Sequence, residues 1–566
     1  VTKKLTNQYI INIIMSFHGS IILLLLAFAS SCTSTASNTT NFAFESRNLK
    51  ILAVFGFPGK SHFMFFQPLV EELARRGHEV TVISHFPRTA KAKAEEPLPT
   101  YRDISVYNES TGLVLNVFNL DNVNDAVYKW FYDMIQLRAL SSMTCNTVLR
   151  NPAVHELLRS GEKFDLLIME SFSTDCCLSI VAHFDAPFIY LSSHQIMPWT
   201  NDRLGNPQES SYIMCIFSNL KWPMDFIGRM INTVTVYLSI LMYNTWFLWE
   251  DQAIVNEIFG PKIPNLAEID QNATALLVNT HFALHGSRSL LPNVIEVGGL
   301  HIPKKRKPLP KDIKEFLDEA HEGVLYFNLG SVVKTSSMTK EKLDIILNVI
   351  SSLPRKVIWK WEVEKLPYKP KNLMVKKWLP QFEIMGHPNV KCYMGHGGLL
   401  GLSEASYHGL PMILMPSFGD QPQNAQVAKG RGMAIILRYR HLSEKILRDA
   451  LDEIFNNTRY HENARKVSKA YRDRPASPLE TAVWWTEYIA RGNGLPYLES
   501  KRRNLSWYHR HLVDVAIFLL IASLVVLYAL YRIVKLALGL KDSSTKKGNI
   551  GNCRRRYSIS CTSSLI

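Results

Sequence analysis

One stretch constrains the fold more than any other: residues 49–84 have the sequence LKILAVFGFPGKSHFMFFQPLVEELARRGHEVTVIS. An apolar run at 51–57 predicts a buried strand, a helical period follows at 63–76, and a second apolar run at 79–84 predicts another strand. Gly77 lies where the C-terminus of a helix favours glycine. A strand, a helix and a strand in this order form the βαβ unit of a parallel sheet, so we expect an α/β fold.

The same alternation continues on both sides of a break in the chain. Apolar runs at 164–170 and 186–193 predict later strands of the first half. The segment GGLHIPKKRKPLPKD at 298–312 is rich in Pro and Lys and lacks an apolar period, which is typical of a linker. Beyond it, runs such as GVLYFNLGS and VKCYMGH again alternate with helical segments. We therefore expect two Rossmann-like domains that face each other across a cleft, where open α/β sheets bind ligands.

The two ends of the chain indicate passage through a membrane. The apolar run at 21–28 is too short to span a bilayer and is followed by small residues, as in a secretory signal. Twenty residues at 512–531 suffice to cross a hydrocarbon core of about 30 Å. Basic residues beyond them favour a cytosolic tail, which together with the signal peptide places the body in the lumen.

From these patterns we predict the following organisation: residues 1–14 as upstream or fragment sequence, 15–37 as a signal peptide, 45–290 as the first domain, 291–314 as the linker, 315–475 as the second domain, 476–511 as closing helices and a juxtamembrane segment, 512–531 as a transmembrane helix, and 532–566 as a basic cytosolic tail.

The net charge of +15 suggests a nucleic-acid partner until the charges are located along the chain. The tail from Arg532 carries +7, and Lys3 and Lys4 add +2, which leaves about +6 for the large body of the protein. Because the body has no dense basic stripe, we expect no nucleic-acid binding.

A third apolar segment, Met230–Trp249, has twenty residues without a charge. It also contains five Asn and Thr residues, which make it a weak candidate for insertion across a membrane. We expect a buried or membrane-dipping amphipathic helix near the acceptor site rather than a span.

The cysteines show no regular framework. There is no Cys-x-x-Cys pair, and the adjacent pair Cys176–Cys177 is a poor candidate for a local disulfide. We therefore expect buried free thiols. The eight cysteines are at positions 32, 145, 176, 177, 215, 392, 553 and 561.

The stretch VKCYMGHGGLLGLSEASYHG places His396, Gly397 and Gly398 between a predicted strand and a predicted helix. Glycines let a ligand approach the backbone N–H groups closely. The N-terminus of a helix offers unpaired N–H donors and the positive end of a dipole. Together they form a site for an anion such as phosphate, and His396 adds a donor beside it. Taken alone, the pattern also fits a plain strand–helix turn.

Three neighbouring motifs make the pattern specific: WLPQ at 378–381, Glu404, and DQ at 420–421. With these motifs the chain resembles the UDP-glycosyltransferase family over nearly its whole body. DCCLSIVAHFDAPFI and HGGLLG are most similar to insect members. The resemblance implies the GT-B fold of two Rossmann-like domains and a UDP-sugar as donor.

The resemblance also implies roles for matching residues, and the chemistry of each side chain suits its role. Trp378 would stack on the uracil ring, Gln381 would bond the uridine, Glu404 would accept bonds from the ribose, His396, Gly397, Gly398 and the loop at Gly330–Ser331 would hold the diphosphate, and Asp420 and Gln421 would bind the sugar hydroxyls. No metal and no further cofactor is required, because helix-terminus donors would stabilise the growing negative charge.

The resemblance assigns the general base to His62, which follows the first predicted strand. A histidine near its ordinary pKa of about 6.5 suits proton abstraction from an acceptor hydroxyl. The imidazole needs an acidic partner. Glu170 ends the strand where family members carry Asp, and Asp175 lies five residues further on. We favour Glu170 and keep Asp175 as its competitor.

The resulting hypothesis is an inverting transferase of the endoplasmic reticulum membrane that conjugates small lipophilic hydroxyl compounds. Residues 100–250, rich in aromatic side chains and Met, would line the acceptor pocket. Insect-like features favour glucose as the transferred sugar, with glucuronate as the alternative. A catalytically silent member that binds lipophilic ligands is the hypothesis from another class. Homo-oligomer formation is left open.

Overall fold

The structure is a computed structural model, which describes residues 48–107, 113, 118–120, 129–363 and 366–538. The predicted upstream segment and signal peptide lie outside these residues, as does the basic tail from residue 539 onward.

The first sheet has seven parallel strands in the order β3-β2-β1-β5-β6-β7-β8. Its strands are β1 (Lys50–Phe55), β2 (Glu79–Ser84), β3 (Tyr101–Ser105), β5 (Leu166–Glu170), β6 (Phe188–Ser192), β7 (Ala273–Val278) and β8 (Val294–Glu296). Because β1 pairs directly with β5, the loops that follow these two strands start side by side at the same edge of the sheet.

The second sheet has six parallel strands in the order β12-β11-β9-β13-β14-β15. Its strands are β9 (Val324–Asn328), β11 (Lys356–Lys360), β12 (Leu373–Lys376), β13 (Val390–Gly395), β14 (Met412–Leu414) and β15 (Ala434–Ile436). Two parallel sheets with alternating helices confirm the predicted α/β fold.

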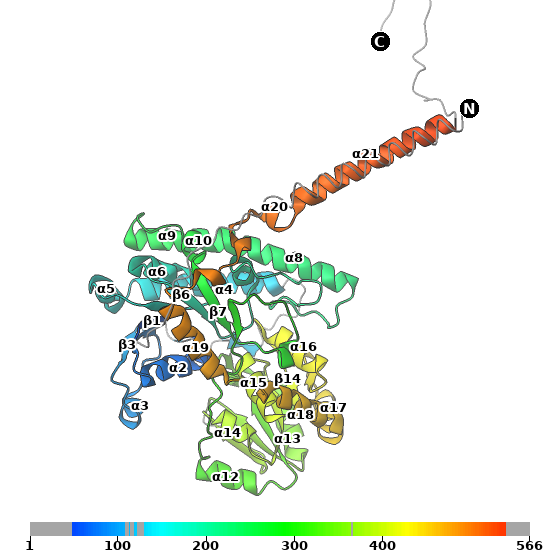
Figure 1. Ribbon diagram of the computed structural model, residues 1–566. Coiled ribbons are helices and arrows are strands. Elements are labelled where there is room, and N and C mark those ends of the chain that lie inside the picture. The colour runs from blue at the N-terminus through cyan, green and yellow to red at the C-terminus, as the bar shows by residue number, and fades with distance from the viewer. Residues whose placement is uncertain (1–47, 108–112, 114–117, 121–128, 364–365, 539–566) are drawn as a thin grey trace, which may run out of the picture. The chain divides into compact units, whose positions relative to one another are not determined.

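Helices cover both faces of each sheet (Figure 1). Those of the first half are α2 (Lys60–Arg75), α3 (Ala90–Glu95), α4 (Lys129–Leu149), α5 (Pro152–Arg159), η2 (Asp175–Cys177), α6 (Leu178–Phe184), α7 (Pro198–Arg203), α8 (Phe226–Met242), the π-helical turn η3 (Tyr243–Phe247), α9 (Leu248–Phe259), α10 (Leu266–Asp270) and α11 (Phe282–His285). Those of the second half are α12 (Lys311–Asp318), η4 (Thr335–Ser337), α13 (Lys340–Ser352), α14 (Gln381–Met385), α15 (Leu399–His408), α16 (Gln421–Gly430), η5 (Tyr439–His441), α17 (Glu444–Asn456) and α18 (Thr458–Arg472). The chain then continues through α19 (Pro478–Arg491), η6 (Pro496–Leu498), η7 (Lys501–Asn504), α20 (Trp507–Arg510) and α21 (Val513–Ala537).

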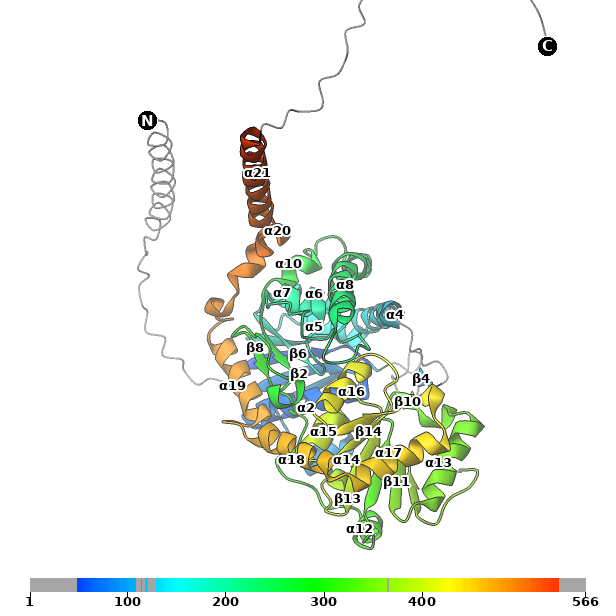
Figure 2. The same ribbon diagram turned by 90° about the vertical axis from the view of Figure 1, so that its right-hand side faces the viewer.

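Burial on both faces explains the apolar strands, because a parallel sheet covered by helices exposes neither side to water. Every residue of β5 and β6 is buried. In the first half α2 packs on one face of the sheet. The late helix α19 comes back to this half and packs against α2 (Figure 1). In the second half α13 and α17 cover one face of the sheet (Figure 2).

Two local features differ from the predicted organisation. Strand β8 lies inside the segment that we expected to be linker, because its three residues pair with β7 and extend the first sheet. A short strand β4 (Phe118–Asn119) from the first half pairs with β10 (Val333–Lys334) from the second half. The two halves are therefore joined by backbone pairing close to the loop that follows β9.

The expectation of free thiols is wrong for two cysteines. Cys145 of α4 and Cys176 of η2 form a disulfide across 31 residues of sequence. The two cysteines pair because α4 packs against η2 in the folded chain. The spacing of cysteines in the sequence does not predict this contact. Cys177, Cys215 and Cys392 are free and buried, as expected. The other three cysteines lie outside the described residues.

Within the part of the chain that the structure describes, two stretches of helix are long and apolar enough to cross a membrane. The predicted anchor forms α21, whose 25 residues measure about 37 Å. The second stretch, Phe226–Phe259, is the α8–α9 segment with its π-helical turn. Polar residues of α8, among them Asn232 and Ser239, are buried, while its apolar residues Phe226 and Leu241 are exposed. The helix thus turns its polar side chains toward the protein.

Candidate active site

His62 lies in the first turn of α2 and contacts the carboxylate at the end of β5. Its Nδ1 lies 2.8 Å from Oε1 of Glu170. The other carboxylate oxygen, Oε2, accepts a bond of 3.0 Å from the backbone N–H of Phe57. The Glu170 side chain is almost fully buried, whereas that of His62 is partly open. A carboxylate on Nδ1 selects the tautomer with its proton there, which leaves Nε2 to accept a proton.

Asp175, the competing partner, is engaged elsewhere. Nη1 of Arg203 lies 2.6 Å from Oδ2 of Asp175, and Nε of Arg203 lies 3.4 Å from Oδ2 of Asp270. Burial raises the pKa of Asp175 to about 6, although the charge of Arg203 opposes the rise. Of the two acids that the sequence offered, the structure therefore brings Glu170 to His62 and leaves Asp175 in a buried ion pair.

Aromatic rings surround the imidazole of His62. The ring centroids of Phe57 and Phe172 lie 4.7 Å and 4.8 Å from it, and that of His194 lies 6.1 Å away. Burial, together with the charge on His62, lowers the pKa of His194 to about 4. His194 is therefore neutral near pH 7, and the wall beside His62 is uncharged and suited to an apolar molecule.

The junction between β13 and α15 has a backbone that only glycine can supply. A Cβ atom on Gly398 would lie 2.4 Å from Nε2 of His396, and one on Gly330 would lie 2.5 Å from Cε1 of the same ring. The imidazole is thus held between two glycines. Gly397 has φ +85°, a conformation that L side chains rarely adopt, and it approaches the carbonyl of Gln421 closely.

This junction fits an anion. Helix α15 begins directly after Gly398, so its first N–H groups have no partner within the helix. Burial, and second the charge of Lys360, lower the pKa of His396 to about 4, so the ring is neutral. Its Nδ1 is buried without a hydrogen-bond partner among the described residues. Ser331, the other residue predicted to hold the diphosphate, follows Gly330 on the loop beside His396.

The predicted uridine end forms one network. Oε1 of Gln381 accepts bonds from Nδ2 of Asn328 at 2.6 Å and from the hydroxyl of Tyr326 at 3.1 Å. Its Nε2 donates to Oε2 of Glu404. Burial raises the pKa of Glu404 to about 7. Trp378, predicted to stack on the uracil ring, is 52% exposed.

The predicted sugar end lies at the start of α16. Oε1 of Gln421 accepts a bond of 2.9 Å from the backbone N–H of Ser417. Nδ2 of Asn424 donates to Oδ2 of Asp420 at 2.8 Å and to the carbonyl of Gly397 at 3.0 Å. Asn424 therefore ties the sugar loop to the anion site. Asn424 is not among the residues predicted from the sequence, because Asn on a helix gives no separate signal.

Both halves of the chain meet at this end of the cleft. Burial raises the pKa of Asp420, and the Asn424 bond and the charge of His62 oppose the rise. Nε2 of Gln195, from the first half, donates to Oε1 of Gln423 at 2.7 Å and to Oδ1 of Asn424 at 2.9 Å.

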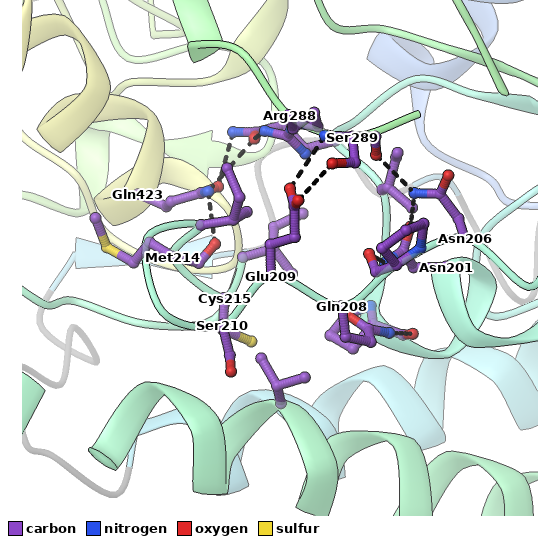
Figure 3. A pocket seen from close by; sticks show the side chains of 17 residues that line it. Asn201, Asn206, Gln208, Glu209, Ser210, Met214, Cys215, Arg288, Ser289 and Gln423 are labelled. Carbon is purple, nitrogen blue, oxygen red and sulfur yellow. Dashed lines mark hydrogen bonds between the residues drawn. The ribbon is translucent and has the colours of Figure 1, made fainter. Parts of the chain in front are cut away.

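A cavity of about 50 Å³ lies beside this contact (Figure 3). Gln423 reaches into it from α16, and polar side chains such as Arg288, Glu209 and Asn206 line it from the first half. A cavity that admits benzene measures roughly 150 Å³. This polar cavity is therefore too small for an aromatic acceptor and is distinct from the aromatic wall beside His62.

The geometry thus places an imidazole–carboxylate pair on one half opposite an anion site on the other. The family model described as "UDP-glucoronosyl and UDP-glucosyl transferase" matches residues 52–547. This chain belongs to that family. As a UDP-glycosyltransferase it is an enzyme that transfers a hexosyl group from a UDP-sugar.

Several curated relatives support the assignment to this transferase family. The chain is 37% identical over 504 residues to UDP-glycosyltransferase UGT5 of Dactylopius coccus, covering 88% of this chain and 94% of the relative. It is 34% identical to UDP-glucosyltransferase 2 of the same insect, covering 88% and 93%. It is 30% identical to UDP-glucuronosyltransferase 2C1 of Oryctolagus cuniculus, covering 81% and 93%.

A solved structure supports the fold. The crystal structure of glycosyltransferase VinC in complex with DTDP matches 78% of this chain and 100% of its own, with a TM-score of 0.52 and 17% identity. The predicted GT-B fold of the transferase is therefore confirmed.

The raised pKa of Glu404 generates a test with uridine, which is neutral between pH 6 and 8. Ribose hydroxyls donate to a carboxylate, so binding favours the ionised form of Glu404. With a pKa of about 7, the ionised fraction rises about tenfold from pH 6 to pH 8. We expect the affinity for uridine, measured by calorimetry, to rise by about the same factor over this range.

The variant Glu404→Gln removes the titrating group and should bind uridine with an affinity that does not depend on pH. Glu341→Gln, at an exposed position in the first turn of α13, is the matched control and should keep the pH dependence. An affinity that is flat from pH 6 to 8 in the unmodified enzyme would contradict the assignment of Glu404 to the ribose.

Proposed function

We propose that the enzyme transfers glucose from UDP-glucose to a hydroxyl group of small lipophilic acceptors, with inversion at the anomeric carbon. The observation that carries this proposal is the pair of His62 and Glu170 between two phenylalanine rings. An apolar acceptor would rest on Phe57 and Phe172, with its hydroxyl near Nε2 of His62. The buried carboxylate on Nδ1 then stabilises the imidazolium that forms.

The reaction is a single displacement. Nε2 of His62 takes the proton of the acceptor hydroxyl while the oxygen attacks the anomeric carbon. The bond from that carbon to the diphosphate breaks, and its electron pair leaves with UDP. Because attack and departure are on opposite faces, an α-linked donor gives a β-glycoside. Backbone N–H groups at Gly397 and Gly398 and the donor of His396 stabilise the charge on the diphosphate, without a requirement for a metal.

The charges around Asp420 support glucose over glucuronate. Burial raises the pKa of Asp133 on α4, and the backbone N–H of Gly419, the residue before Asp420, opposes the rise. Asp133 is also paired with Lys129 one turn earlier, and both side chains are largely buried. The positive charge of Lys129 acts on Asp420 as well. A neutral hexose adds no further charge to these two buried carboxyl groups, whereas a hexuronate would bring a third carboxylate to them.

The alternative donor, UDP-glucuronate, is supported by the likeness to mammalian glucuronosyltransferases. The variant Asp133→Asn separates the two, because it removes one negative charge and leaves Lys129 free to pair with a sugar carboxylate. A unit charge roughly 10 Å away is worth about 1.7 kcal/mol at an effective dielectric constant of 20. We expect kcat/KM for UDP-glucuronate, relative to UDP-glucose, to rise about tenfold in microsomal assays.

The matched control is Asp449→Asn, which breaks an exposed Lys–Asp pair of the same spacing on α17. It should leave the donor ratio unchanged. A preference of the unmodified enzyme for UDP-glucuronate would overturn the glucose proposal directly.

The role of His62 has its own test. His62→Ala should lower turnover by about 10²–10⁴, the usual contribution of a general base. Affinity for UDP should stay within about twofold, because the anion site belongs to the other half. Turnover is measured with UDP-glucose and a phenol, and binding by calorimetry. The exposed His321 provides the control His321→Ala, which should behave as the unmodified enzyme. Full activity of His62→Ala would favour a different base, and an unmodified enzyme that binds UDP without turnover would favour the silent binding protein.

We place the body in the lumen of the endoplasmic reticulum, as a single-pass type I protein anchored by α21. The Cys145–Cys176 disulfide supports an oxidising compartment. The segment before the anchor is bound to the first half. Nη1 of Arg503 donates to the carbonyl of Ala273 at 3.0 Å, and Nη1 of Arg510 lies 2.9 Å from Oδ1 of Asp202.

The exposed face of α8 fits the membrane surface beside this anchor. The rings of Tyr237 on α8 and His511 before α21 lie 6.0 Å apart, so the helix runs next to the root of the anchor. Phe226 and Leu241 are 69% and 58% exposed on the same helix. A helix that buries its polar side chains and exposes apolar ones is suited to lie in the lipid interface.

Removal of α21 tests this position of α8. A chain that ends at residue 511 should still sediment with microsomal membranes. Introducing Phe226→Glu and Leu241→Glu should release it, because each buried apolar side chain contributes about 1.5–3 kcal/mol. The control Ile446→Glu, at an exposed apolar residue of α17, should not. A truncated chain that is already soluble would contradict interfacial binding by α8.

A further inference from the structure

A lysine from the first half of the chain covers the ring that is assigned to the uracil base. Lys60 is the first residue of α2, two residues before His62. Its Nζ lies 3.9 Å from the ring centroid of Trp378, which follows β12 in the second half. Among the described residues, no carboxylate pairs with Lys60. Its ammonium group thus spans the cleft to an aromatic face without a counterion of its own.

A second lysine, Lys360, lies nearby. Nζ of Lys360, at the end of β11, donates to the carbonyl of Gly330 at 2.7 Å, on the loop that packs against His396. Burial lowers the pKa of Lys360, and the charge of Lys60 lowers it further. Glu362 lies 3.4 Å from Nζ of Lys360 and also accepts bonds from two backbone N–H groups. The surplus of positive charge lies beside the diphosphate site.

We propose that Lys60 is a diphosphate-binding residue that covers Trp378 only while the donor site is empty. Uracil displaces the ammonium group from the ring, because a base stacked on an aromatic side chain is a stronger contact than a cation over an exposed ring. The flexible stem of Lys60 then carries its charge to the diphosphate while α2 stays in place. This inference rests on the proposed donor site and adds to it a binding residue, Lys60, from the opposite half of the chain.

The contribution to the reaction follows from the position of the charge. When the bond from the anomeric carbon to the diphosphate oxygen breaks, the electron pair stays on UDP, and the acceptor proton is on His62. Lys60 gives up no proton in this step. Its positive charge stabilises the departing anion from the opposite half of the chain.

Two ligands separate the two positions of Lys60. In calorimetry with the full-length enzyme, Lys60→Ala should weaken UDP about tenfold, through the loss of one phosphate contact. The same variant should bind uridine equally well or about threefold more tightly, because the ring is uncovered. Lys60→Arg keeps the charge and should hold UDP affinity within about threefold of the unmodified enzyme.

Lys356→Ala is the matched control, since Nζ of Lys356 lies 4.7 Å from the ring of Phe316, away from the cleft. It should change neither affinity. Equal weakening of UDP and uridine in Lys60→Ala would show a merely structural lysine, and unchanged UDP affinity would show a lysine that never reaches the phosphates. Either result overturns the proposal. Failure of the unmodified enzyme to bind UDP at all would instead refute the donor site itself.

Discussion

The contact between one imidazole and bare backbone governs the donor half of this enzyme. His396 fits only because the residues on either side of its ring, Gly330 and Gly398, lack a Cβ atom. The same absence of side chains leaves the first N–H groups of α15 open to a ligand. A Cβ atom would lie 2.4 Å from the ring at Gly398 or 2.5 Å from it at Gly330, so the ring would have to move. The packing of the histidine and the proposed binding of phosphate therefore depend on the same glycines.

A few amide side chains connect the loop of Asp420 and the first half of the chain to the glycines around His396. Asn424 bonds both the carbonyl of Gly397 and the carboxylate of Asp420, so the sugar loop and the anion site move together. Gln195 reaches Asn424 from the first half and links the aromatic wall around His62 to the same unit. Fixed hydrogen bonds of this kind hold reacting groups in place before the substrate arrives, which lowers the cost of reorganisation during the reaction.

Features encoded in short stretches of sequence could be predicted, whereas features that depend on contacts between distant segments could not. Apolar runs predicted the strands, and the glycines of the HGG motif predicted the anion site, because both signals are contained in a few consecutive residues. The pairing of His62 with Glu170 rather than Asp175 depends on the direction of the Glu170 side chain at the end of β5. The Cys145–Cys176 disulfide and the role of Asn424 arise where helices meet, and β8 is too short to show a pattern. Lys60 gave no signal, since its contact with Trp378 joins residues from different halves.

A crystal structure with UDP-2-deoxy-2-fluoroglucose tests the central claim most directly, because this donor analogue binds without rapid transfer. We expect phosphate oxygens about 3 Å from the backbone nitrogens at Gly397 and Gly398, and the anomeric carbon turned toward Nε2 of His62. A diphosphate held elsewhere, or a sugar whose reacting face points away from His62, would contradict this claim.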